Sequence, residues 1–271
     1  MTHRSGIYRL ALVVLITVMP APAAISTQNL NTVTAAALAN TLVGAGVSIS
    51  NISFTGANVA AGLFTGGTGI IGFEQGVILS SGDIANTIGP NVEDGITTVN
   101  GTAGDTNLTA LSGFETHDAA VLEFDFVPNA ATVFFQYVFA SDEYNEYVNT
   151  EYNDVFAFFI NGVNCATVGS PAVAVSINTI NNGNPFGAGG TNPGLYRNND
   201  LDDGGGSIDT EMDGLTAVLT CQSAVTPNAT NHIKLAIADA ADSAWDANVF
   251  LRTGSFSTIS PNRRRAQVTG D

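Results

Sequence analysis

The sequence predicts an all-β protein, an antiparallel β-sandwich of jelly-roll or lectin-like type with a short N-terminal helix. Three observations lead to this class. Short runs of β-branched and aromatic residues recur along the chain, residues typical of turns separate them, and no helical period lies between them. Some runs alternate in polarity and others are apolar on both faces. This mixture is typical of a sandwich with a covered inner layer rather than of a βαβ fold.

The first predicted element is a helix over residues 32–42, because TVTAAALANTL is rich in alanine and Gly44 and Gly46 follow it. The predicted strands are Val47–Phe54, Gly76–Ser81, Ala119–Phe126, Thr132–Ala140, Val155–Ile160, Ala172–Ile177, Leu215–Thr220, His232–Ala238 and Val249–Phe256. The stretches Gly82–Gly113 and Asn178–Gly214 exceed normal hairpin loops. We therefore expect them to be functional loops or to carry short extra strands.

Residues 1–23 have the three parts of a secretory signal peptide. Basic residues begin the segment, an apolar run extends from Leu10 to Met19, and Ala21-Pro22-Ala23 supplies a small-residue cleavage site. The apolar run is half the length that crosses a bilayer. No second such run follows, so we expect no transmembrane segment in the mature chain and a secreted or cell-surface location.

The charge balance of the chain excludes one class of partner. It contains 24 Asp and Glu residues against 8 Lys and Arg residues, for a formal net charge of −16. Such a surface repels the phosphate backbone, so we expect no nucleic acid as partner. Divalent cations are the natural counter-charge.

The chain contains two cysteines, Cys165 and Cys221. In an exported protein a pair of cysteines is more often bridged than free, and four-ligand metal spacing is absent from the sequence. We therefore expect a disulfide between them, near one edge or end of the sandwich.

Two clusters of acidic residues suit Ca²⁺, which prefers carboxylate, amide and backbone oxygens in loops. In the first, Asp142 and Glu143 leave one predicted strand, and Asp154 enters the next. If these strands are neighbours, the oxygens meet at one end of the sandwich. The second, weaker set is Asp200, Asp202 and Glu211. It departs from an EF-hand because Gly204 occupies a ligand position and no helices flank the loop.

Three tyrosines, Tyr144, Tyr147 and Tyr152, lie within the first acidic cluster. Their amphipathic rings suit stacking on sugar faces and equally suit covering the loop. Paired carboxylates also occur in glycosidases, but in so acidic a chain a chance pair is expected. The sequence has neither a Gly-x-Ser-x-Gly elbow nor a His-Glu-x-x-His helix. We therefore predict no catalytic residues.

Three motifs carry a family resemblance. Residues 139–144 read FASDEY and residues 153–162 read NDVFAFFING, with LAIADA at residues 235–240. Together they resemble the bacterial choice-of-anchor L domain family, over a β domain that we place at residues 24–257, before a polar tail at residues 258–271. The resemblance implies an exported domain of the cell surface or matrix, which members anchor by different C-terminal sorting signals. Neither a Leu-Pro-x-Thr-Gly nor a Pro-Glu-Pro sorting signal follows Phe256, which favours free secretion.

Three classes of function remain. We expect a non-enzymatic surface or matrix module that binds a polysaccharide or protein, stabilised by calcium and suited to carbohydrate. The alternative is a secreted carbohydrate-active hydrolase that uses paired carboxylates. A purely structural component of the matrix is the third class.

Overall fold

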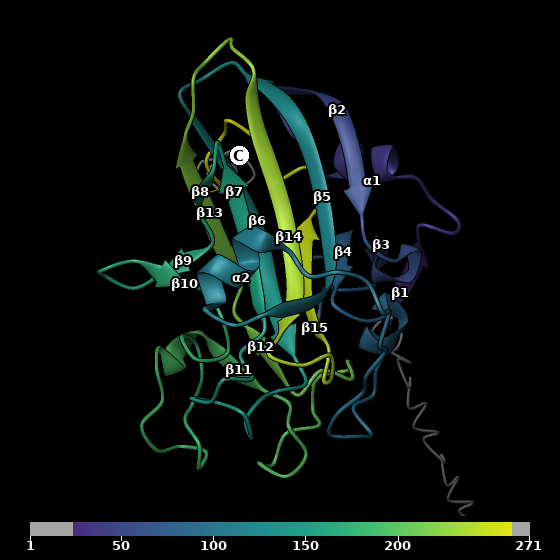
Figure 1. Ribbon diagram of the computed structural model, residues 1–271, viewed down its shortest axis with the longest axis vertical. Coiled ribbons are helices and arrows are strands. Elements are labelled where there is room, and N and C mark those ends of the chain that lie inside the picture. The colour runs from purple at the N-terminus through teal and green to yellow at the C-terminus, as the bar shows by residue number, and fades with distance from the viewer. Residues whose placement is uncertain (1–23, 262–271) are drawn as a thin grey trace, which may run out of the picture.

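Two antiparallel sheets face each other in residues 24–261, the part of the chain that the computed structural model describes (Figure 1). The predicted all-β sandwich is confirmed. The predicted signal peptide, residues 1–23, and residues 262–271 of the predicted tail lie outside the described residues. In residues 24–261 no helix has the length and apolarity needed to span a membrane.

The larger sheet has eight strands, in the order β1-β3-β4-β15-β6-β12-β11, and β13 also pairs with β6. Their bounds are β1 Ser26–Asn29, β3 Ala61–Thr65, β4 Gly76–Ser80, β6 Thr132–Ser141, β11 Tyr196–Asn198, β12 Gly214–Thr216, β13 Leu219–Ala224 and β15 Ala247–Arg252.

The smaller sheet has five strands, in the order β2-β5-β14-β7-β8. Their bounds are β2 Val47–Thr55, β5 Thr116–Pro128, β7 Val155–Ile160, β8 Val163–Asn164 and β14 Asn231–Ala240. A separate hairpin joins β9, Thr167–Val168, to β10, Val173–Ala174.

Most predicted strands form close to their expected bounds, and three need correction. The expected strand Val249–Phe256 is β15, which ends at Arg252. Of the expected strand Ala172–Ile177 only Val173–Ala174 pairs, and the chain turns at Ser176, whose carbonyl accepts from the Thr179 and Ile180 amides. The expected strand Leu215–Thr220 is two strands, β12 and β13, separated at residues 217–218. The short strands β1, β3, β8, β9 and β11 were not predicted, because their few residues give little periodicity.

The predicted helix forms as α1, Ala35–Leu42, with the Thr34 side chain accepting from the Ala37 amide. A second helix, α2 Thr106–Ser112, lies in the stretch that was expected to be a loop or short strands. Asp105 caps its first turn and Gly113 ends it with a φ of +82°. Three 3₁₀ turns are η1 Asn58–Ala60, η2 Ile84–Thr87 and η3 Pro193–Leu195.

The main core lies between the two sheets and is aromatic. Phe135 on β6 lies 4.8 Å from Phe158 on β7, and Phe139 stacks on Phe156 at 4.9 Å between ring centroids. Two smaller apolar clusters cover the outer faces. One contains Phe250 and Leu215 of the larger sheet, and the other packs Leu108 of α2 on the smaller sheet. These outer layers explain why some strands are apolar on both faces.

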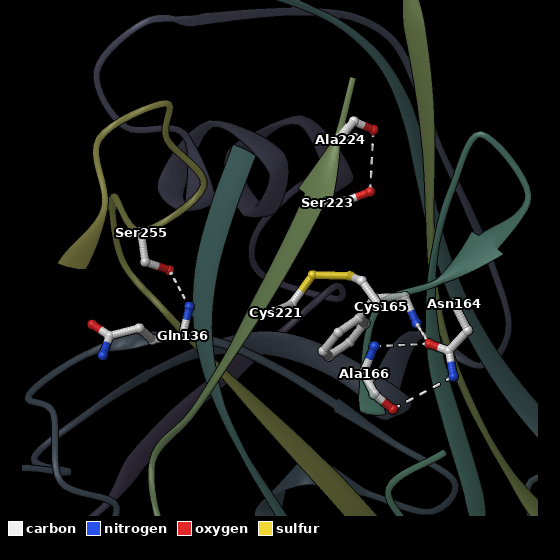
Figure 2. The surroundings of a disulfide bond; sticks show 9 residues. Gln136, Asn164, Cys165, Ala166, Cys221, Ser223, Ala224 and Ser255 are labelled. Carbon is white, nitrogen blue, oxygen red and sulfur yellow. Dashed lines mark hydrogen bonds between the residues drawn. A yellow bond between two sulfur atoms is a disulfide. The ribbon is translucent and has the colours of Figure 1, made fainter. Parts of the chain in front are cut away.

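The predicted disulfide is confirmed. Cys165, just after β8, is bonded to Cys221 on β13, with 5.3 Å between the Cα atoms (Figure 2). Strand β8 is the edge of the smaller sheet, and β13 pairs only with β6 of the larger one. The bond therefore links the two sheets at one edge, as expected from the sequence.

The two ends of the sandwich differ in their connections. At the end that we call the turn end, short turns join β5 to β6 and β7 to β8. At the opposite end, which we call the loop end, residues 142–154 connect β6 to β7 and residues 241–246 connect β14 to β15. Long loops gather there, at the lower end of the view in Figure 1.

Candidate functional site

Three aspartates lie side by side where strands of the larger sheet reach the loop end. Ser141 of β6 is in register with Ala247 of β15 and with Gly214 of β12. Asp142 follows Ser141, whereas Asp246 and Asp213 precede Ala247 and Gly214 in the antiparallel neighbours. Asp142 therefore lies between Asp246 and Asp213. The Asp142 amide donates to the Asp246 carbonyl at 3.3 Å. We call Asp246, Asp142 and Asp213 the first aspartate row.

The smaller sheet carries a second aspartate row at the same end. Ala238 of β14 is in register with Val155 of β7, which places Asp239 beside Asp154. On the other side of β14 the register with β5 shifts, and Asp118 lies at this irregularity with a φ of +50°. Asp154, Asp239 and Asp118 form the second row.

These six aspartates are buried, with at most 1% of each residue exposed. The Lys and Arg residues within residues 24–261 are Arg197, Lys234 and Arg252, and the ion pairs that form there join His232 to Glu123 and Asp125, and Lys234 to Asp105. No cation of the described chain therefore pairs with either row. Burial of unpaired carboxylates is costly, and it favours their neutral form or a bound cation.

The pKa values of five of these carboxyls reflect this surplus of negative charge. Burial, with the nearby charges of Asp213 and Asp246, holds the pKa of Asp142 well above its usual range. Burial and the charges of neighbouring carboxylates, Asp246 among them, do the same to the pKa values of Asp154 and Asp239. Burial likewise raises the pKa of Asp246 to about 7 and that of Asp213 to about 8. Because Asp246 acts on carboxyls of both rows, the two sheets share one electrostatic cluster.

Several oxygens of this cluster have no hydrogen-bond partner among the described residues. They are both carboxylate oxygens of Asp142, both of Asp239, Oδ2 of Asp154, Oδ2 of Asp213 and Oδ1 of Asp246. The Asp213 amide lowers the raised pKa of Asp142 in part, and the Ser81 hydroxyl does the same for Asp239. Neither contact meets the distance and angle of a hydrogen bond. The Ser81 hydroxyl instead bonds with the backbone of Ala247. Buried polar atoms are normally satisfied, so these oxygens indicate a missing partner.

The residues of the first predicted calcium set, Asp142, Glu143 and Asp154, all lie at the loop end but do not share one aspartate row. Asp142 belongs to the first row, whereas Asp154 belongs to the second row and its amide donates to Glu143 Oε2 at 3.0 Å. The prediction assumed that the two strands flanking this set, β6 and β7, are neighbours. This assumption is wrong, because β6 and β7 lie in opposite sheets. The connection at residues 142–154 nevertheless brings all three carboxylates to the loop end.

The second predicted set is held by backbone amides. Asp200 accepts from the amides of Asp202 and Asn145, at 2.8 and 3.1 Å. Glu211 accepts from the amides of Val92 and Glu93 instead of facing the other two. Asp202 is exposed. The carboxylates of Asp200 and Glu211 thus already have structural partners.

The three predicted ligand-binding tyrosines have different surroundings. Tyr144 is fully buried, its hydroxyl donates to the Ile180 carbonyl at 2.7 Å, and its ring packs on Tyr196. This corrects the expectation for Tyr144, because a buried core ring cannot stack on a ligand. Tyr147 and Tyr152 are half-buried, with their rings 5.3 Å apart.

A pocket of about 160 Å³ opens beside these two tyrosines. It is lined by Glu143, Tyr147, Tyr152, Asp242, Ala244 and Trp245. The Trp245 ring lies edge to face with Tyr147, with 4.7 Å between centroids. Burial is the main cause that raises the pKa of Glu143, and the charge of Asp242 adds to it.

Sequence reasoning did not select Asp118, Asp213, Asp239, Asp246 or Trp245 as site residues. The signal that identifies the aspartates is positional: each stands next to a strand end, and these strand ends share one end of the sandwich. Strand order and register, which the sequence does not reveal, are needed to see this. Trp245 is the single tryptophan of the chain and adjoins Asp246.

The family described as the choice-of-anchor L domain matches residues 25–257, which is most of the chain. No curated protein and no solved structure matches it.

Proposed function

The chain belongs to the choice-of-anchor L domain family, a family of extracellular surface-associated modules, and on this premise we propose that it binds carbohydrate at the loop end without catalysing a reaction. In this proposal the protein is exported by a cleaved signal peptide at residues 1–23. It contributes to adhesion by holding a surface or matrix polysaccharide. Calcium, bound by carboxylates of the same end, stabilises the fold.

The pocket formed by Tyr147, Tyr152 and Trp245 is the observation that supports this function. Aromatic rings bind the apolar faces of sugars, and the Glu143 and Asp242 carboxylates accept hydrogen bonds from sugar hydroxyls. A volume of about 160 Å³ suits one sugar ring rather than a long chain held in a groove. We therefore expect recognition of single residues along a polysaccharide, with strength gained from many copies.

A glycan array with and without calcium tests the proposal, followed by titration of a retained glycan against variants. Trp245→Ala removes the largest ring of the pocket and is expected to weaken binding about tenfold, or about 1.4 kcal/mol. Phe114→Ala is the matched control, since Phe114 is 43% exposed and does not line this pocket. An array with no retained glycan in either condition contradicts carbohydrate binding.

The hydrolase alternative is favoured by one observation. Glu143, with its raised pKa, shares the pocket with Asp242, and a general acid beside a second carboxylate is the arrangement of glycosidases. We expect incubation with polysaccharides to release no reducing ends. Release that disappears in Glu143→Gln would instead establish the enzyme.

A further inference from the structure

We propose that Asp154, Asp239 and Asp246, with Asp142 beside them, bind one calcium ion that joins the two sheets at the loop end. The inference deepens the calcium part of the proposed function and rests on it only for the extracellular location. It keeps Asp142 and Asp154 of the first sequence-predicted calcium set and adds Asp239 and Asp246, so that both sheets contribute ligands. Glu143, Asp200, Asp202 and Glu211 are not ligands in this proposal.

The four aspartates are close together through backbone geometry. Asp239 and Asp154 adjoin across paired strands β14 and β7, and Asp142 and Asp246 adjoin across β6 and β15. Asp246 belongs to the larger sheet, yet its charge acts on Asp154 and Asp239 of the smaller one. The four side chains therefore form one group that spans both sheets.

Six buried oxygens of this group have no partner among the described residues: two on Asp142, two on Asp239 and one each on Asp154 and Asp246. The other oxygens of Asp154 and Asp246 are held in place. Asp154 Oδ1 accepts from the Ala240 amide at 3.1 Å, and Asp246 Oδ2 accepts from the Thr98 amide at 2.9 Å. Backbone amides thus orient the carboxylates and leave the remaining oxygens free.

The Asp246 carboxylate also occupies space that only glycine leaves open. A Cβ atom at Gly82 would lie 1.7 Å from Asp246 Oδ2. A side chain at position 82 would displace the carboxylate from its place beside the β4 strand end. The sequence thus keeps room for a charged group in a buried position, where an apolar side chain would avoid the desolvation cost.

The chemistry of the group selects calcium among common cations. Calcium takes six to eight oxygens at 2.3–2.6 Å in flexible geometry, and it accepts carboxylates from several elements. Magnesium needs near-ideal octahedral geometry and keeps several waters, which a buried site does not favour. Zinc prefers His and Cys, and the two cysteines are bonded to each other.

Within residues 24–261 no three His, Cys, Asp or Glu side chains are already arranged to hold a metal ion. Binding therefore requires the carboxylates to converge. Within each sheet, side chains on paired antiparallel positions have Cβ atoms about 4.5–5.5 Å apart, so rotation of the side chains brings the oxygens of Asp239 and Asp154, and those of Asp142 and Asp246, toward one another. Mutual repulsion opposes this convergence until a cation is present.

Thermal unfolding of the full exported chain tests the site in four buffers: chelator, CaCl₂, MgCl₂ and NaCl matched in ionic strength to the CaCl₂ buffer. With calcium at about a hundred times its Kd, we expect Tm to rise by about 5–10 °C. We expect no comparable rise in sodium and a smaller one in magnesium. Coincident calcium and sodium curves would overturn the proposal.

Two isosteric variants locate the site. Asp239→Asn and Asp246→Asn each remove one negative charge, so they should fold in chelator with a Tm at or above that of the wild type and lose most of the calcium shift. Asp202→Asn is the control, because Asp202 is exposed and should keep the full shift. A calcium shift that survives in both variants and disappears in Asp200→Asn places the ion in the loop at residues 198–206 and refutes the proposal.

Terbium gives a readout that does not depend on stability. It substitutes for calcium at oxygen sites, and its luminescence is sensitised by a nearby indole, here Trp245 next to Asp246. We expect excitation of Trp245 to produce terbium emission that calcium displaces and that Asp246→Asn abolishes. Glycan binding that persists in chelator while terbium emission is absent would refute this site and leave the carbohydrate proposal standing.

Discussion

At the turn end of the sandwich, Phe256 contacts Phe124, Phe126 and Phe135, whereas at the loop end the buried side chains include six aspartates that pair with no cation in residues 24–261. The turn end is completed by the chain itself, through apolar burial and a disulfide. The loop end has buried charge that the chain does not balance. We therefore expect the stability of the loop end, and not that of the turn end, to depend on the cations and protons in the solution.

The largest effect that separates the two ends is expected from Phe256→Ala. Phe256 is 2% exposed and its ring has three aromatic neighbours, so truncation leaves a cavity in the core. We expect the free energy of unfolding to fall by about 3–5 kcal/mol. Urea denaturation should show the same loss in calcium and in chelator. A loss that calcium reverses would mean that the two ends are not independent.

The second effect is expected from removal of the disulfide by the double substitution Cys165→Ala and Cys221→Ala. The bond spans a sequence separation of 56 and links the edges of the two sheets. We expect a loss of about 2–4 kcal/mol, mainly because the unfolded chain gains freedom. The shift that calcium produces in Tm should persist in this variant, and its disappearance would connect the disulfide to the loop end.

A dependence on pH should appear at the loop end when calcium is removed. Burial raises the pKa of Asp213 to about 8 and that of Asp246 to about 7, above the value of 3.8 for an unperturbed Asp. Between about pH 4 and pH 8 the folded state therefore binds more protons than the unfolded state, and the free energy of unfolding falls as pH rises.

In chelator we thus expect higher stability at pH 5 than at pH 8, measured by urea denaturation at both values. In calcium the gain at pH 5 should shrink or reverse, because protons compete with the ion for the same oxygens. Equal stability at the two pH values in chelator would show that burial does not raise the pKa values of these aspartates.

The smallest effect is expected from His232→Gln on the outer face of the smaller sheet. His232 bonds with Asp125 at 2.9 Å and Glu123 at 3.3 Å, but its side chain is 48% exposed. Exposed pairs contribute little because solvent screens them. We expect no resolvable change in Tm in either calcium or chelator, which makes this variant a baseline for the two ends.

The sequence was sufficient for the parts that local pattern decides. Alternation predicted β5, with Leu122, Phe124 and Phe126 inside, and the pair of cysteines predicted the disulfide. The sequence also located the acidic end near Asp142 and Asp154. It did not identify Asp239 and Asp246 as their companions, because that depends on strand order and register, which are set by contacts distant in the chain.

Two further misses concern Tyr144 and helix α2. Tyr144 lies among acidic residues in the sequence, yet Gly214 leaves space in which its ring is buried. Helix α2 has seven residues, too few to show a clear helical period, although Asp105 and Gly113 mark its ends. Contact with a residue distant in the chain, Gly214, determines the place of Tyr144. The capping residues Asp105 and Gly113 determine the bounds of helix α2.

Hydrogen exchange of the backbone amides, followed in calcium and in sodium at matched ionic strength, tests the different dependence of the two ends most directly. We predict that calcium slows exchange at the loop end, at the amides of Asp154 and Ala240, and leaves the turn end around Cys221 unchanged. Equal slowing at both ends, or no slowing at Asp154 and Ala240, would contradict a calcium ion held between the two sheets.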